Sequence, residues 1–219
     1  MNARPGKKTG PKPRFTRGDI VDAVLEIGLD TFTLGDVAAK LGVATSALYR
    51  HVTSRDEIIA LTLERIVRNV RWDMPGETWQ DLLRAQGMQF WDLCEAYPGL
   101  SRVIIDFTGS SSFAKRVIHD LLAELDRRGL SPKRAIFALD FIGDSVLIVH
   151  QAVSAMRSVD EEGRTGLERA YEFFSDQPAD AALHPSPTWV ESGSIKAKIE
   201  LIIRGIESLP DEFFENTGL

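Results

Sequence analysis

The side chains with the clearest chemical use follow one another in one short run: Thr45, Ser46, Ala47, Tyr49, Arg50 and His51. The two hydroxyls can hydrogen-bond to base edges, and the alanine methyl can meet a thymine methyl group. The phenol, guanidinium and imidazole groups can reach phosphate oxygens. The chemistry that this run predicts is recognition of double-stranded DNA. For Tyr49, packing of the ring inside the fold is the alternative.

Two short helices joined by a glycine turn would position this run. Thr33-Leu34-Gly35-Asp36 has the form of a capping box, and the apolar residues after it follow the spacing of an amphipathic helix. Gly42 ends that helix, and a second one is expected from about Thr45 to His51. The residues that can form a small shared core are Val37, Ala38, Leu41, Val43 and Leu48. This pattern predicts a helix-turn-helix motif.

The flanking segments favour the same interpretation. A capping box at Thr16 to Asp19 opens a helix that ends near Gly28, and a third box at Ser54 to Glu57 opens a longer helix to about Trp72. Residues 1–17 hold six basic and no acidic side chains, although the whole chain has a net charge of −6. We expect residues 1–15 to be a disordered basic arm. Its Lys12 and Arg14 either enter a minor groove or serve solubility.

Helical patterns continue to the C-terminus, at about 78–98, 99–107, 111–128, 132–156, 166–176 and 192–208, with a loop at 177–191. No segment alternates with period two between turn residues, so the predicted fold class is all-α. The expected organisation is an arm at 1–15, a helix-turn-helix domain at 16–54, a connecting helix at 55–72 and a ligand-binding and dimerisation domain at 73–219.

Several classes of protein are disfavoured. A single cysteine, Cys94, excludes an internal disulfide, and no nucleotide-binding, hydrolase or metalloprotease motif is present. The longest apolar stretch is interrupted by two aspartates and is too short to span a membrane. We therefore expect a cytoplasmic protein without catalytic residues, metal or other cofactor. A helical-bundle enzyme and a helix-turn-helix that docks only to proteins remain as alternatives.

The residues from Thr33 to Val43, Leu48-Tyr49-Arg50-His51-Val52 and Ser54-Arg55-Asp56-Glu57 resemble the DNA-binding signature of the TetR family. This resemblance implies that Thr45, Ser46 and Tyr49 face DNA, that His51 contacts the backbone and that Arg55 binds phosphate. Thr33 and Gly35 are also placed on the DNA side. Ala44 stands where the family often has a capping serine, and Gly35 stands where tetracycline repressors have a base-reading arginine. The operator of those repressors is therefore not expected here.

The resemblance also implies a homodimeric repressor, which binds a palindromic operator and is released by a small-molecule effector that the sequence does not identify. The last predicted helix presents isoleucines at a spacing suited to another helix: Ile195, Ile199, Ile202 and Ile206. In families that the chain resembles, this helix and the one at 132–156 pair with their copies. We therefore expect the isoleucines at the dimer interface, with packing inside one chain as the alternative.

Asp140 and Asp144 lie one turn apart in an apolar stretch, where unpaired burial of a carboxylate is costly. Arginines of other helices could pair with them, namely Arg68, Arg71 or Arg102. Alternatively, they contact a polar or cationic effector in a pocket whose other predicted lining residues are Phe90, Cys94, Phe107, Ile118, Phe137 and Phe141. Tetracycline is not expected, because residues 99–109 lack the histidine through which tetracycline repressors hold the drug's magnesium.

Overall fold

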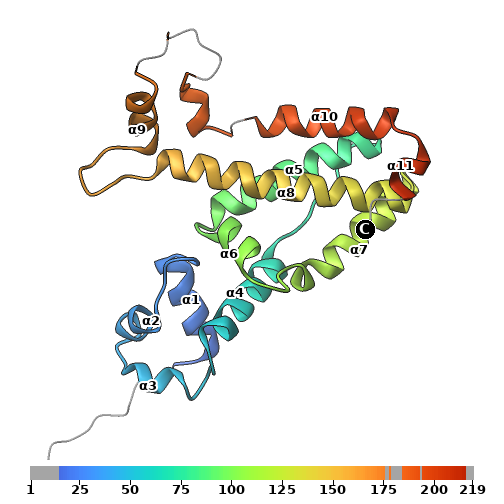
Figure 1. Cartoon of the computed structure of the whole chain (residues 1–219). Coiled ribbons are helices and arrows are strands. Elements are labelled where there is room, and N and C mark those ends of the chain that lie inside the picture. Colours follow the sequence, from blue (N-terminus) through green and yellow to red (C-terminus); the bar gives the residue numbers. More distant parts are fainter. Residues whose placement is uncertain (1–14, 176–177, 179–183, 193, 216–219) are drawn as a thin grey trace, which may run out of the picture. The chain divides into compact units, whose positions relative to one another are not determined.

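The computed structural model describes residues 15–175, 178, 184–192 and 194–215. This part of the chain is built from helices and contains no named strand (Figure 1). Its only extended pairing is an isolated antiparallel bridge between Val159 and Thr165. The all-α prediction is therefore confirmed.

The chain divides into two compact units, and the boundary between Ile66 and Val67 lies inside a helix. The first unit contains α1 (Arg17–Ile27), α2 (Leu34–Lys40), α3 (Thr45–Leu48) and most of α4 (Arg55–Asn69). Helix α4 ends three residues before the expected Trp72. The boundary falls within the range 55–72 that the sequence suggested for a connecting helix.

Side-chain caps start the helices of the first unit. Thr16 with Asp19 and Thr33 with Asp36 form the two reciprocal capping boxes that the sequence predicted. The third box is different, because the Glu57 carboxylate accepts hydrogen bonds from the backbone N–H and hydroxyl of Thr53, at 2.6 and 2.7 Å, rather than from Ser54. These bonds lower the pKa of Glu57, while its N–H donates to the Ser54 hydroxyl at 3.1 Å, as the box predicted.

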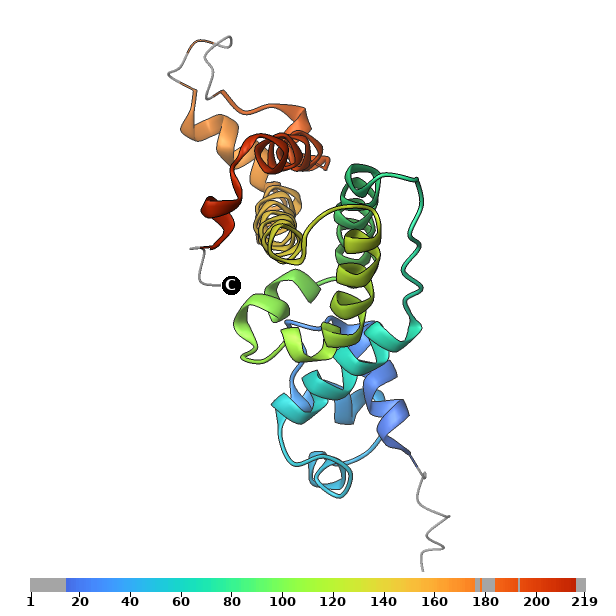
Figure 2. The ribbon, with the colours of Figure 1, turned by 90° about the vertical axis from the view of Figure 1, so that its right-hand side faces the viewer.

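The second unit contains the remaining elements: α5 (Trp79–Ala96), α6 (Leu100–Asp106), α7 (Ser111–Arg127), α8 (Pro132–Arg157), α9 (Gly166–Phe173), the 3-10 helix η1 (Pro187–Val190), α10 (Ile195–Ser208) and α11 (Asp211–Glu215). Helix α8 contacts α5, α6, α7, α9, α10, α11 and η1, so it is the centre of this unit (Figure 2). Neither η1 nor α11 was predicted from the sequence, because each has fewer than six residues and shows no helical period.

The core of the second unit lies between α5, α8 and α10. Gly87 on α5 permits a close approach there, since a Cβ atom at this position would lie 2.5 Å from Cδ1 of Ile199 and 3.1 Å from Cγ2 of Ile142. Leu82, Leu83 and Cys94 are fully buried on the same helix. By length and mean hydropathy alone, α8 could cross a membrane. Its buried apolar residues, such as Ala138, Ile142 and Val146, belong to the core of this unit.

A connector, residues 70–78, joins α4 to α5 and is held in place by side chains of the second unit. Arg128, whose side chain is only 4% exposed, donates hydrogen bonds to the carbonyls of Met74, Pro75 and Thr78 at 2.8 to 3.1 Å. Gln86 and Gln89 both donate to the carbonyl of Asp73, at 2.8 Å each. The connector therefore has a fixed path along α5, although it contains no helix.

Candidate functional site

The helix-turn-helix is closed by a small apolar core and a left-handed glycine. Val37, Ala38 and Leu48 are buried, as expected, whereas Leu41 and Val43 are only half-buried. Gly42 has φ +66°, which a residue with a side chain rarely adopts. This turn lets the N–H of Val43 bond to the carbonyl of Ala38 at 3.0 Å, so that α3 follows α2 at once.

Helix α3 is short and turns its polar side chains outward. Thr45, Ser46, Tyr49 and Arg50 are exposed, and Ala47 is half-buried. Tyr49 is 55% exposed, which argues against the alternative of a packed ring. The hydroxyl, phenol and guanidinium groups are therefore exposed, whereas Leu48 is the buried residue of α3.

The predicted recognition helix, 45–51, begins at Thr45 as expected but ends early, at Leu48. No side chain bonds to the first N–H groups at Ala44, as the missing serine led us to expect. After Leu48 the chain continues in tight turns, with the N–H of His51 bonded to the carbonyl of Leu48 at 2.8 Å. Such i to i+3 bonds are typical of a helix end that tightens into a 3-10 turn.

Two residues that sequence reasoning missed support the end of α3. The Nε of Arg17 donates to the carbonyl of His51 at 2.7 Å, and its Nη2 pairs with Glu57 at 2.9 Å. The ring of Phe15 lies 4.5 Å from the His51 ring. His51 is therefore half-buried and fixed from the rear. His51 and Glu57 lie 34 and 40 residues after Arg17 in the sequence, so no local pattern could reveal these contacts.

Arg55 has a role that the resemblance did not imply. Its guanidinium donates to the carbonyls of Asp30 and Phe32, at 3.1 and 3.4 Å, and lies 4.6 Å from the centre of the Phe32 ring. It thus holds the loop before α2 against the start of α4. This support of the motif was not expected from the sequence, and the contact of Arg55 with phosphate stays a prediction.

Of four other residues predicted on the DNA side, the structure describes two, Thr33 and Gly35. Thr33 is exposed, and its hydroxyl is engaged in the capping box of α2. Gly35 is exposed, and a Cβ atom there would meet only Oγ1 of Thr33, at 3.5 Å, so a side chain would fit. Lys12 and Arg14 lie outside the described residues.

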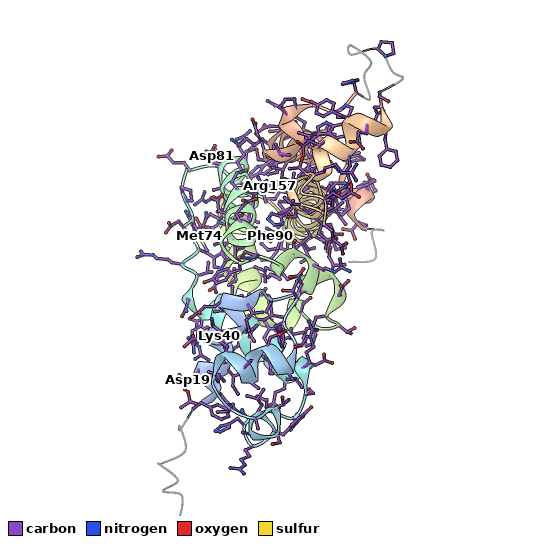
Figure 3. The ribbon with its side chains drawn as sticks, turned by 90° about the vertical axis from the view of Figure 1, so that its left-hand side faces the viewer. Asp19, Lys40, Met74, Asp81, Phe90 and Arg157 are labelled. Atoms are coloured by element: carbon purple, nitrogen blue, oxygen red, sulfur yellow. The ribbon has the colours of Figure 1, made fainter. Side chains whose placement is uncertain are left out.

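The eight residues predicted to line an effector pocket differ in their exposure and in their neighbours. Cys94 is fully buried, and burial raises the pKa of its thiol to about 12, while Phe90 on α5 packs against the core (Figure 3). Phe107 lies against Phe113, and Ile118 is half-buried on α7. Phe137 and Phe141 instead contact each other at the α11 end of α8. Phe90 and Phe137 pack against the same apolar cluster, whereas Phe141 is 49% exposed, and a pocket shared by these residues stays a prediction.

Asp140 and Asp144 were predicted to line this pocket, and that prediction is wrong. Both are exposed on the side of α8 that faces away from the core. The structural alternative also fails for two of the arginines, because Arg71 pairs with Asp73 and Arg102 pairs with Asp106. The helical phase of the buried residues Ala138 and Ile142 already implied this outward position.

The second unit buries polar side chains that sequence reasoning missed. Gln86 is 4% exposed; its Nε2 holds the connector, whereas its buried Oε1 has no protein partner among the described residues. A second group links α6 and α8, where the Ser101 hydroxyl lies 3.0 Å from Nδ1 of His150. Burial lowers the pKa of His150, so its ring stays neutral to a lower pH than that of a free histidine.

The four isoleucines predicted for the dimer interface are buried inside one chain. Ile195, Ile199, Ile202 and Ile206 are at most 8% exposed and join the core formed with α5 and α8. The alternative of packing within the chain is therefore correct. The outer surface of α10 carries other residues, among them Leu201, which is 72% exposed.

No family model matches the sequence. The chain is 30% identical over 174 residues to the HTH-type transcriptional repressor DrrR1 of Streptomyces coeruleorubidus, a match that spans 77% of this chain and 63% of DrrR1. It is 36% identical over 84 residues to the class D tetracycline repressor protein of Escherichia coli, spanning 35% of this chain and 38% of the repressor. The matches thus cover less than two thirds of either relative.

Solved structures extend the likeness to almost the whole chain. The TetR family protein ActR of Streptomyces coelicolor, in complex with actinorhodin, superposes with a TM-score of 0.61 at 22% identity, covering 89% of this chain and 96% of ActR. A TetR variant of Acinetobacter baumannii AYE in complex with minocycline gives a TM-score of 0.55 at 20% identity, covering 89% and 97%. At these identities the likeness concerns the fold. In sequence the chain is thus similar to named transcriptional repressors, and in fold it is similar to TetR family proteins.

Proposed function

We propose that this chain is a homodimeric transcriptional repressor that binds a palindromic operator and leaves it when a small molecule binds the second unit. The exposed polar surface of α3, supported by the buried Leu48 and by the bond from Arg17 to the carbonyl of His51, carries the proposal. Its groups match those that read base edges and phosphates in a major groove. Two relatives that the sequence matches are named repressors. Such a protein would act in the cytoplasm, where its DNA lies.

A dimer follows from the size of the motif. One helix-turn-helix offers one short recognition helix, and proteins of this kind place two of them one DNA turn apart through two-fold symmetry. Exposed apolar side chains on the sides of α8 and α10 that face away from the core are suited to a second copy: Phe141, Ile148 and Leu201 are 49%, 59% and 72% exposed. This surface replaces the isoleucines as the proposed interface.

The effector would bind within the second unit, where Gln86 offers a hydrogen-bond acceptor. A buried amide oxygen without a partner costs free energy, and a ligand that donates an N–H or O–H group would recover it. ActR binds actinorhodin and the A. baumannii repressor variant binds minocycline, and both names suggest probes for a first screen. Displacement of the protein from its DNA by such a probe, and not by solvent alone, would support this part.

Selection of DNA from a random pool, followed by gel-shift titration, tests the function. The full chain should select a palindrome, and Tyr49→Ala should weaken binding to it by ~1–3 kcal/mol because a side chain facing the groove is lost. Tyr171→Ala, a change on α9 in the second unit, is the matched control and should leave DNA affinity unchanged. Failure to enrich any sequence would favour a motif that docks only to proteins.

A further inference from the structure

The outer face of α8 mixes apolar side chains with two carboxylates. This face consists of Asp140, Phe141, Asp144 and Ile148, which recur at successive turns opposite the buried residues of the helix. In the described part of the chain, no ion pair or hydrogen bond joins either carboxylate to another side chain. Two anions therefore lie in an apolar strip, and neither pairs with a cation among the described residues.

These two anions act on each other. Asp140 and Asp144 are four residues apart on one helix, a spacing at which like charges repel. Partial burial raises the pKa of Asp140, and the charge of Asp144 raises it further. A second surface that brought only apolar groups here would bury the carboxylates further and would strengthen the repulsion between them, and both effects cost free energy. A surface that brought a cation would remove them.

The outer face of α10 supplies such a cation. It consists of Ala197, Leu201, Arg204 and Ser208, which lie opposite the buried isoleucines. The Arg204 side chain is 73% exposed and pairs only with Glu207, one turn further on, at 3.1 Å. Glu207 also accepts a hydrogen bond from Gln80 at 2.9 Å. Arg204 can therefore change partner without leaving Glu207 alone.

We propose that, in the homodimer, Asp144 of each protomer forms an ion pair with Arg204 of the partner subunit, with Asp140 at the edge of the same contact. The inference rests on the homodimer proposed above and names the charges that align it. Helices α8 and α10 lie side by side in each chain, so their outer faces adjoin (Figure 2). Two-fold symmetry then makes the pair twice, once on each side of the axis.

Charge also selects this arrangement over its main rival. If α8 lay against its own copy, the aspartates of the two protomers would meet, and like charges across an interface oppose association. Contact between α8 and the partner's α10 brings opposite charges together. The ion pairs thereby favour a second copy of this chain over related chains that lack the aspartate or the arginine.

Sedimentation equilibrium of the full chain with Asp144→Asn tests the contact. The ion pair predicts a weaker dimer, by about tenfold in Kd, and a smaller loss of affinity on adding salt. A tighter dimer would show that the aspartates face each other and would overturn the proposal, as would an unchanged Kd. Asp126→Asn, an exposed aspartate on α7, is the control and should leave the Kd unchanged.

Charge reversal gives a sharper second test. Asp144→Arg alone and Arg204→Asp alone should each dissociate more readily, because each homodimer then brings two like pairs together. Mixed in equal amounts, the two variants should form heterodimers, in which both contacts again join opposite charges. Random mixing would refute the ion pair while leaving the dimer intact. A wild-type chain that is monomeric at micromolar concentration would refute the homodimer itself.

Discussion

Both units of this protein bury an apolar core, but they differ in the contacts that position their elements. In the first unit, charged and polar side chains fasten loops and helix ends: Arg17 holds the end of α3, and Arg55 holds the loop before α2. In the second unit, long helices pack through aliphatic side chains around α8. All three buried side-chain atoms without a hydrogen-bond partner in the described residues belong to this second unit, on Trp72, Gln86 and Arg164.

This difference separates the tasks that we propose for the units. A surface that reads DNA has to keep its side chains in fixed positions, and hydrogen bonds with defined geometry supply that. Apolar packing is less directional, so helices can shift against one another while they stay buried. Polar atoms left unpaired in such a core are places where a ligand can add an interaction. The three predictions below test the comparison, from the largest expected effect to the smallest.

The largest effect is expected in the apolar core. Ile199→Ala removes a side chain that is 2% exposed between α5 and α8, and it should lower the free energy of unfolding by ~2–5 kcal/mol. Urea unfolding measures this. Leu201→Ala, two residues away and 72% exposed, is the control and should mainly weaken the dimer. If Ile199→Ala only dissociated the dimer and left each protomer as stable as before, the isoleucines would line the interface after all.

A smaller effect is expected where an arginine fastens the first unit. Arg55→Met removes two hydrogen bonds to carbonyls and a contact with the Phe32 ring, so stability should fall by ~1–3 kcal/mol. The salt dependence of DNA binding should keep its slope, because the guanidinium of Arg55 is already engaged by the two carbonyls. Arg50→Met, at an exposed and unsupported side chain, should instead reduce that slope by about one. Equal changes in slope would restore the phosphate role of Arg55.

The smallest effect concerns pH. Hydrogen bonds from Arg127 and Arg128 lower the pKa of Glu124 from 4.5 to about 2. A carboxyl with a lowered pKa in the folded state stabilises the fold above its unfolded pKa, and this contribution is lost as the pH falls from 4.5 towards 2. Glu124→Gln should therefore flatten the acid branch of a stability curve in that range. Asp126→Asn on the same helix should not, and an identical curve for both variants would contradict the assignment.

The sequence predicted the first unit better than the second, for a physical reason. The boxes at Thr16 and Thr33 join residues three positions apart, so the pattern that specifies them is local. The same holds for the turn at Gly42 and the uncapped start at Ala44. Arg17 with Glu57, and Arg55 with Asp30, are contacts across the fold, and a single sequence contains no signal for such pairs.

In the second unit the periodicity gave the right faces but not their neighbours. The spacing of Ile195 and Ile199 predicted a buried stripe, yet a stripe does not indicate whether its own chain or a copy covers it. For Asp144, the helical phase of Ile142 and Val146 was available and placed the carboxylate outside. Gln86 could not be identified in advance, because its value as a site depends on an amide oxygen that no neighbour reaches.

The hydrogen bonds from Arg128 to the connector limit where two regulators can be joined into a hybrid. One guanidinium grips the carbonyls of Met74, Pro75 and Thr78, so the number of residues in this stretch is set by the reach of a single side chain. Insertions or deletions there would release the grip. Exchange of DNA-reading heads between relatives should therefore use a junction at Ile66, ahead of the connector, so that each sensor keeps its own 70–78 segment together with its own Arg128.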